Sequence, residues 1–572
     1  MMNLRQDETT EDWPLRPWIM AAICATAGLL FHFLTDHVYG EAVVRWRQAG
    51  ATFVAIAALS FVLTVEQRRW TWSLAFAVGW GAMLALVGWF TAAYNQYPTI
   101  FEWPFLSGVF AVLLAAPLFQ TMRDSFSEGG ARRFPYPRLH NHAWTDAVIG
   151  AASLAFVGIT FLLAWLIAGL FDLIGNDLVK ELLKKDWFGW TLAGFAFGAA
   201  LGLLRERDAL VATLQRLAMV VLAVLAPVLA AALVLFLASL PFTGLAKLWD
   251  SSIPATPLML VAGAGAILLA NAVIGNGDDD RATSRILRIA ALALVLTVLP
   301  LAIIAAVSLA QRIGQYGWTP ERIWGVIAVG VAVVYGLAGW WSVAKGRLQF
   351  DDLLRPLQTK MAIGLCGLAL LLALPIIDFG AISARSQLAR LQSGSVKADE
   401  FDWAAMAFDF GPSGRDRLAK IARTGAADQR GLAKGALRET NRWKAVNAIE
   451  ARRAGREIEQ RLRLATPDIV LTDELREAIG KEYSCREHVD ACVLMRIGPE
   501  RYLLLSTSGK KKLVSSGLID LANNRNASGK GFVGREAAPV EGVDLGSAKL
   551  ELREVKRRQL LVDGKPVGEP FE

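Results

Sequence analysis

The stretch "ALPIIDFGAISARSQLARLQSG", residues 373–394, divides the chain into two parts of different composition. Before it, long apolar runs alternate with short polar joints, whereas residues 384–572 have the composition of an ordinary polar protein. A helix needs about 20 mainly apolar residues to span a bilayer, and the part of the chain before this stretch contains runs of this kind. The sequence therefore predicts a membrane-embedded first part and a soluble second part.

The composition of the whole chain agrees with this division. Of its 572 residues, 54% are hydrophobic and 20% are charged, which is below the quarter usual for soluble proteins. Residues 384–572 hold 34 Lys and Arg against 27 Asp and Glu, so their net charge of +7 is nearly all of the chain's +8. A basic tail suits contact with anionic partners such as lipid head groups, but it is also typical of a solvated surface. We expect no nucleic-acid partner.

The apolar runs predict a membrane all-α fold, a polytopic bundle of about eleven transmembrane helices within residues 17–382. They lie at 17–34, 49–65, 72–93, 103–122, 143–171, 187–204, 217–242, 255–274, 289–310, 323–343 and 361–382. Tryptophans near the ends of these runs, such as Trp70 and Trp187, suit the head-group layer. The lipid bilayer is therefore the first expected partner.

The Lys and Arg residues of the joints predict how these helices are oriented. Alternate joints counted from the N-terminus hold 18 of these residues, and the other joints hold 8. Because the basic side faces the cytoplasm, residues 1–16 and 123–142 are expected inside and residues 36–48 outside. Eleven crossings then place the tail outside, and one crossing more or fewer would reverse its side. The acidic segment before the first run argues against a cleaved signal peptide.

Downstream of residue 382 the sequence predicts a soluble α+β domain. Residues 383–466 are expected to form a basic helical stem, and residues 467–572 a small β-rich module. In the module, "CVLMRI" and "RYLLLS" flank a three-residue turn at Gly498-Pro499-Glu500, which predicts a hairpin. The segments "AKLELREV" and "RQLLVDGKPVG" suggest a second pair of strands.

The many apolar runs, the exit segment "LPIIDFGAISARSQLARLQSG" and the following "FDWAAMAFDFGPSGRDRL" together resemble domain-of-unknown-function family 4153. The resemblance covers residues 20–425 and leaves the β-rich module outside it. The family consists of uncharacterised polytopic proteins of the bacterial inner membrane, so the resemblance implies this location. The basic residues of the joints add the expectation of a cytoplasmic N-terminus and a periplasmic C-terminal domain. It supplies no catalytic or ligand-binding residues.

The sequence offers little that indicates catalysis. It contains no phosphate-binding G-x-x-x-x-G-K-[ST], no H-E-x-x-H and no G-x-S-x-G, and no charged residue stands near the middle of an apolar run. His140 and His142 could begin a metal site, but no further ligand lies near them in sequence. We therefore expect no catalytic, cofactor-binding or metal-binding residues. Asn271, an amide inside an apolar run, is a candidate for a polar contact with a neighbouring helix or for the cap of its own helix.

Cys485 and Cys492 are a candidate disulfide, because an oxidising periplasm preserves such bonds. On one continuous helix, residues seven apart lie about 10.5 Å apart along the axis, beyond the 7 Å reach of a disulfide. A bridge therefore requires the helix to end between them. Free thiols remain an alternative, and so does a zinc site that includes His488, although structural zinc sites usually bring cysteines closer together.

Three functions remain open at this point. The first is a non-enzymatic membrane protein that presents a periplasmic domain for interaction or sensing, with an envelope protein or anionic lipid as partner of the basic stem. The alternative is a transporter or channel whose pathway runs among the helices. An enzyme acting on lipid-linked substrates is a third, but the sequence shows no paired carboxylates or nucleophile–base set for it.

Overall fold

The computed structural model describes residues 13–36, 44–92, 98–127, 134–244, 254–278, 280–482, 485, 489–508, 513–524, 558–562 and 565–571. The chain forms two compact units. The first comprises residues 1–390 with 409–413, and the second comprises residues 391–408 with 414–572.

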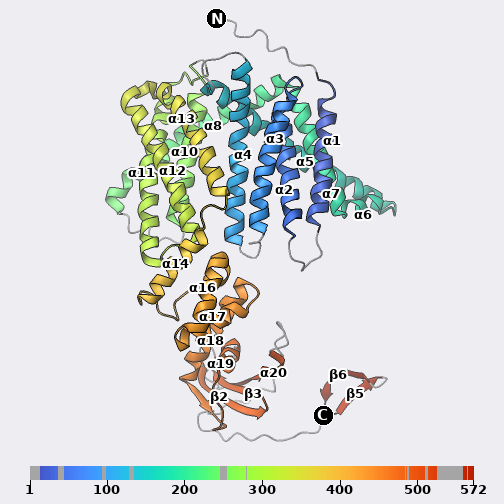
Figure 1. Cartoon of the computed structure of the whole chain (residues 1–572), viewed down its shortest axis with the longest axis vertical. Coiled ribbons are helices and arrows are strands. Elements are labelled where there is room, and N and C mark those ends of the chain that lie inside the picture. Colours follow the sequence, from blue (N-terminus) through green and yellow to red (C-terminus); the bar gives the residue numbers. More distant parts are fainter. Residues whose placement is uncertain are drawn as a thin grey trace. The chain divides into compact units, whose positions relative to one another are not determined.

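The first unit is a bundle of long apolar helices (Figure 1). They are α1 (Arg16–Thr35), α2 (Arg45–Thr64), α3 (Trp70–Thr91), α4 (Pro98–Ser127), α5 (Tyr136–Leu173), α7 (Asp186–Arg205), α8 (Asp208–Thr243), α10 (Ala255–Ile274), α11 (Arg285–Tyr316), α12 (Pro320–Gly346) and α13 (Phe350–Ala373). A helix of 20 residues is about 30 Å long, the thickness of the hydrocarbon core of a bilayer. Each helix therefore has the length of a membrane span.

By length and composition, the described residues contain ten segments able to cross a membrane. The last of these, Pro320–Ala373, is 54 residues long and contains both α12 and α13, which the short 3-10 helix η2 (Arg347–Gln349) separates. The predicted polytopic membrane protein is thus confirmed, with ten such segments against the eleven expected. The two longest apolar runs each lie in a single helix, α5 and α8.

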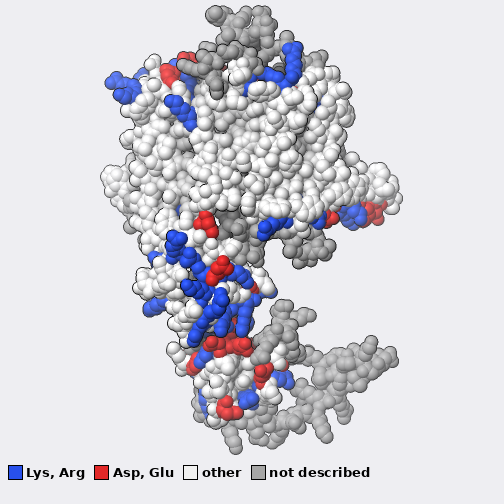
Figure 2. Space-filling view, viewed as in Figure 1, with Lys and Arg blue, Asp and Glu red and all other residues white. Residues whose placement is uncertain are grey.

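The surface of the first unit agrees with immersion in lipid. Large apolar side chains such as Leu162, Leu235 and Val261 are at least 70% exposed, although they belong to apolar helices. Figure 2 shows a broad band of this unit without charged side chains, between two rims that carry Lys, Arg, Asp and Glu. This distribution is what a bilayer requires of a protein that it surrounds.

Buried residues form several cores in this bundle, and two of these cores each join four or more helices. One core joins α8, α10, α11, α12 and α13 around residues such as Leu294 and Leu301. The other joins α1, α2, α5 and α7 around Met20, Leu63 and Leu201. Packing along these interfaces fixes the ends of the helices, where the polar residues of the unit gather.

The contact between α1 and α7 is made close by glycine. Gly194, Gly198 and Gly202 recur every four residues and so lie on one face of α7. A Cβ atom added to Gly198 would lie 2.2 Å from the carbonyl oxygen of Met20 in α1, and one added to Gly194 would lie 2.1 Å from that of Cys24. The helix backbones therefore touch, as in other small-residue interfaces of membrane helices.

The second unit combines helices with a small sheet. Its elements are α15 (Trp403–Phe408), α16 (Gly411–Thr424, whose first residues count with the first unit), α17 (Ala427–Arg438), α18 (Arg442–Glu459), α19 (Asp473–Lys481) and α20 (Leu521–Asn524). The strands are β1 (Leu462–Leu464), β2 (Val489–Gly498), β3 (Arg501–Ser508), β4 (Leu513–Asp520), β5 (Arg558–Val562) and β6 (Lys565–Phe571). The helix α14 (Phe379–Gln392) belongs to the first unit as far as Arg390.

The sheet has the strand order β1-β2-β3-β4, with β1 parallel to β2 and the other pairs antiparallel. The predicted hairpin is present as β2 and β3, whereas β4 was not predicted. Strands β5 and β6 pair with each other and begin within "RQLLVDGKPVG", and β6 continues to Phe571. The expected partner of this segment, "AKLELREV", lies outside the described residues. A core that includes Leu475, Leu494 and Leu504 packs α19 against this sheet.

Candidate functional site

One cluster of polar residues in the first unit surrounds the C-terminal end of α2. The last carbonyl groups of a helix have no partners within it, and the end carries a partial negative charge. Here Arg123 donates to the carbonyl oxygen of Thr64 over 2.6 Å, and Arg16 donates to that of Val65 over 3.1 Å. Arg205 donates to the carbonyl oxygen of Leu63. Arginines from α4, α1 and α7 thus cap one helix end.

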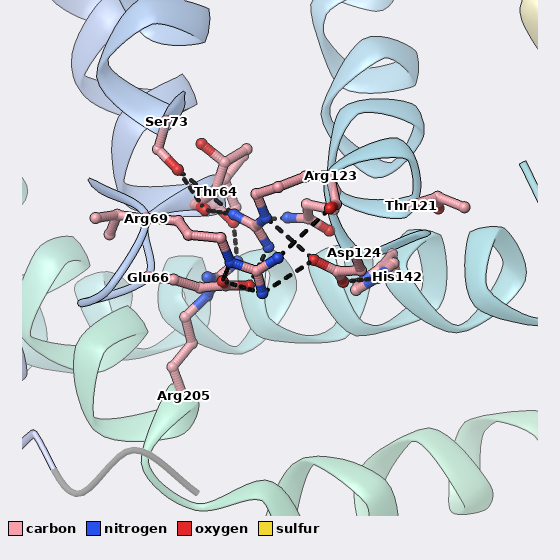
Figure 3. Close-up of polar contacts among 12 residues, drawn as sticks. Thr64, Glu66, Arg69, Ser73, Thr121, Arg123, Asp124, His142 and Arg205 are labelled. Carbon is pink, nitrogen blue, oxygen red and sulfur yellow. Dashed lines mark hydrogen bonds and ion pairs between the residues drawn. The ribbon is translucent and has the colours of Figure 1, made fainter. Parts of the chain in front are cut away.

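Carboxylates beside this helix end balance the arginines (Figure 3). Glu66 accepts from Arg69 at 2.9 Å and from Arg123, whose side chain is only 3% exposed. Asp124 accepts from Arg123 at 3.1 Å and lies 3.6 Å from Arg69. A buried guanidinium is tolerated only when ion pairs and hydrogen bonds surround it. The geometry therefore matches a structural ion-pair network.

A third carboxylate joins the network from α5. Asp146 lies 3.3 Å from Arg205, and both side chains are 12% exposed. Gln120 donates over 2.8 Å to the carbonyl oxygen of Leu63 and over 3.3 Å to Asp146. The side chains from α4, α5 and α7 thus bind each other as well as the end of α2.

His142 adds an imidazole to the network (Figure 3). Its Nε2 atom lies 3.0 Å from Asp124. A histidine held by a carboxylate supplies two of the three members of a catalytic triad. The third member is a nucleophile that is hydrogen-bonded to the other ring nitrogen. Asp124 is itself bound by two arginines, which favours a structural pair. His140 has a different partner, the hydroxyl of Tyr136 at 3.1 Å, so the two histidines do not converge on a common ligand position.

A similar arrangement caps the C-terminal end of α10. Arg355 of α13 donates over 2.8 Å to the carbonyl oxygen of Ile274, the last residue of α10. Asp351 accepts from Arg355 at 2.9 Å and from Arg281 at 3.2 Å. Both clusters lie at the same end of the bundle, where α1, α3 and α5 begin and where α2, α4 and α10 end.

Three carboxylates of the second cluster come close enough together to hold a cation. They are Asp278, Asp351 and Asp352. Asp278 and Asp352 lie 3.4 Å and 3.3 Å from Arg355, and Arg355 also binds Asp351. The guanidinium already supplies the positive charge that a metal ion would bring, so the donor set favours an ion-pair cluster.

Asn271 contacts the neighbouring helix α13. Its Oδ1 atom accepts a hydrogen bond of 2.6 Å from the amide nitrogen of Gln358. An interhelical amide pair of this kind replaces the hydrogen bonds that lipid cannot offer. The contact joins α10 and α13 next to the Arg355 cluster on the same two helices.

Cys485 and Cys492 are joined by a disulfide in the structure, with their Cα atoms 6.0 Å apart. Cys485 lies after the end of α19, and Cys492 lies on β2, so the two residues are not on one continuous helix. Both are buried in the core that α19 shares with the sheet. The other two cysteines, Cys24 and Cys366, are free.

The arginine-capped helix ends were not predicted from the sequence. Arg16, Arg123 and Arg205 lie at the edges of apolar runs, where a basic residue is expected for reasons of orientation alone. The available signal was the presence of both signs of charge, with Gln, at those edges. Which helix end they cap depends on tertiary packing, which a run-by-run interpretation does not contain.

The comparisons with known proteins give one match. Residues 51–419, more than half of the chain, match the family model described as "Domain of unknown function (DUF4153)". No curated protein and no solved structure matches the chain.

Proposed function

We propose, from the premise that this chain belongs to the DUF4153 family, that it is a non-enzymatic membrane anchor presenting a folded periplasmic domain for interaction or sensing. The first unit is a multi-pass membrane bundle. The second unit is the part offered to a partner. The observation that carries the proposal is the separation of the chain into two compact units, of which, among the described residues, the first alone has helices able to span a membrane.

The orientation follows from basic residues and from an odd number of crossings. We count α12 and α13 as two crossings, because each exceeds 20 residues and η2 separates them. A count of eleven crossings supports the assignment of the start of α1 and the end of α13 to opposite sides of the membrane. The joints on the side of the α1 start hold 18 Lys and Arg against 8, which supports a cytoplasmic N-terminus and a periplasmic second unit. The inner membrane of a bacterium is the matching location.

The internal polar residues support a structural role for the bundle. The arginines of both clusters bind carboxylates and helix ends. A transport pathway would need polar groups that change partners between two states of the bundle. The amide pair Asn271–Gln358 is the observation that favours the transporter alternative, because it is polar and lies between two membrane helices.

Site-specific photo-crosslinking tests the proposal. A photoreactive amino acid is placed in the full chain at Trp443 or Val470, which are 73% and 75% exposed in the second unit. We expect discrete adducts with an envelope protein in intact cells. A matched probe at Leu162 of α5, which is 73% exposed on the membrane bundle, should react with lipid instead. If the probes in the second unit yield no protein adduct while the chain is correctly inserted, the proposal is wrong.

A further inference from the structure

A cavity lies at the end of the bundle opposite to the arginine-capped helix ends. It measures about 280 Å³ and is open to the outside. It lies between the C-terminal half of α5, the short helix α6 (Leu178–Leu183) and the start of α7, beside one another in Figure 1. Its lining includes Phe161, Leu183, Lys185, Asp186, Gly189 and Trp190. We propose that this cavity binds one acyl chain of an anionic glycerophospholipid, with the phosphate at Lys185.

The walls of the cavity suit a hydrocarbon chain. Phe161, Leu183 and Trp190 supply apolar surface from three different helices, and Gly189 leaves the space between them open. The face of α5 beside the cavity is apolar and exposed, with Leu162 and Leu166 at 73% and 60%. A chain entering from the bilayer therefore meets apolar surface on three sides, and the charged part of the lining is confined to Lys185 and Asp186. The volume is near the lower limit of about 300 Å³ for ligand pockets, which fits part of a lipid and excludes a whole one.

The lysines at the mouth of the cavity determine which lipid head group the cavity prefers. Lys180 forms an ion pair with Asp172 at 2.9 Å, and Lys184 forms one with Glu181 at 2.8 Å. The hydrogen bond to Asp172 holds the pKa of Lys180 above its ordinary value. Lys185 is exposed, and within the described part of the chain it forms no ion pair. It is thus the ammonium group available to a phosphate.

Asp186 weakens the preference of Lys185 for an anionic head group. It is the first residue of α7, where the positive end of the helix dipole stabilises a carboxylate. Its charge lies next to Lys185 and weakens the attraction of a second anion. Trp187 and Trp190 follow within one turn, and both rings are partly exposed, as expected at the head-group layer. The mouth of the cavity therefore lies at the depth where a phosphate resides.

Photo-crosslinking with two lipids tests this inference on the full chain. Proteoliposomes contain phosphatidylglycerol or phosphatidylcholine, each with the same diazirine-bearing acyl chain, and mass spectrometry counts adducts on peptides of α5 and α7. We expect the phosphatidylglycerol adducts at the cavity to exceed those of phosphatidylcholine by about two- to fivefold, the range of an exposed ion pair. Lys185→Gln should remove this preference, and Asp186→Asn should increase it. Lys184→Gln is the control, because Lys184 is already ion paired.

A second substitution tests the acyl chain directly. A Cβ atom at Gly189 would contact nothing within 4 Å, so Gly189→Leu can fill the cavity without a clash with the backbone. We expect it to reduce the cavity adducts of both lipids severalfold. Gly169→Leu on α5, which also adds a side chain into open space, should leave them unchanged. Unchanged adducts in Gly189→Leu, or equal labelling by the two lipids in the unsubstituted protein, would overturn the inference.

Discussion

Arg123 shows what a single buried charge does in this bundle. Its guanidinium donates to the end of α2 and binds Glu66 and Asp124, so one side chain joins α4 to the end of α2 and to the connection that follows it. The planar guanidinium offers its N–H donors in a rigid fork that matches a carboxylate, which the ammonium group of a lysine does not. At the residue scale, the polar parts of this membrane unit serve mainly to satisfy one another.

Removing this side chain should destabilise the bundle strongly. We expect Arg123→Ala to cost about 3 kcal/mol, the lower part of the range for breaking a buried pair, because Arg69 still binds Glu66. Arg123→Lys should recover part of the loss. The measurement is unfolding of the purified protein in a titration with sodium dodecyl sulfate. Arg207→Ala, an exposed arginine at the same end, is the control. Equal midpoints for Arg123→Ala and Arg207→Ala would contradict the structural role.

At the scale of elements, the glycine contact between α1 and α7 predicts that Gly→Ala changes the stability in opposite directions at two positions. Within a helix, Gly→Ala usually stabilises by about 0.5–1 kcal/mol. We expect this for Gly158→Ala on α5, where the new Cβ atom meets nothing within 4 Å. Gly198→Ala should instead destabilise by about 1–3 kcal/mol, because the Cβ atom would collide with the backbone of α1. The same unfolding titration measures both, and a stabilised Gly198→Ala protein would disprove the close contact.

The disulfide between the helical and sheet elements of the second unit gives another prediction. Protein from cells that secrete into an oxidising periplasm, alkylated without reductant, should show Cys485 and Cys492 linked in its mass spectrum. Cys485→Ser should lower stability by at most about 2–3 kcal/mol, because the closed loop is short. The free Cys24, which is buried, should react only after denaturation and serves as an internal control. Alkylation of both Cys485 and Cys492 without reductant would mean that the bond is absent.

The helices themselves were predictable from the sequence, but their partners were not. A run such as 187–204 reveals α7 through length and composition alone, and the spacing of Gly194, Gly198 and Gly202 was visible within it. Nothing in that run names α1 as the neighbour. In the tail, the turn residues after Gly498 indicated the hairpin, whereas β4 contains Ser515, Ser516 and Gly517, which weaken the usual strand pattern.

At the scale of the whole molecule, the orientation can be read with two single cysteines. The background lacks the four native cysteines. We expect Asp177→Cys, in the connection between α5 and α7, to react with an impermeant thiol reagent in intact cells. Ser284→Cys, at the start of α11, should react only after the cells are opened. Both positions are exposed in the structure. The reverse pattern would place the second unit in the cytoplasm.

The pairing of α1 with α7 also has a consequence for biosynthesis. Arg16 and Asp186, where the two helices begin, are 170 positions apart (186 minus 16). At about 5–20 residues per second, a ribosome needs about 10–30 s to make the intervening chain. During that interval α1 is already in the membrane, and the surface destined for Gly198 faces lipid or an insertion factor. The packing of α7 against α1 therefore comes late in translation. Until then, the nascent chain depends on lipid or on an insertion factor to cover the exposed face of α1.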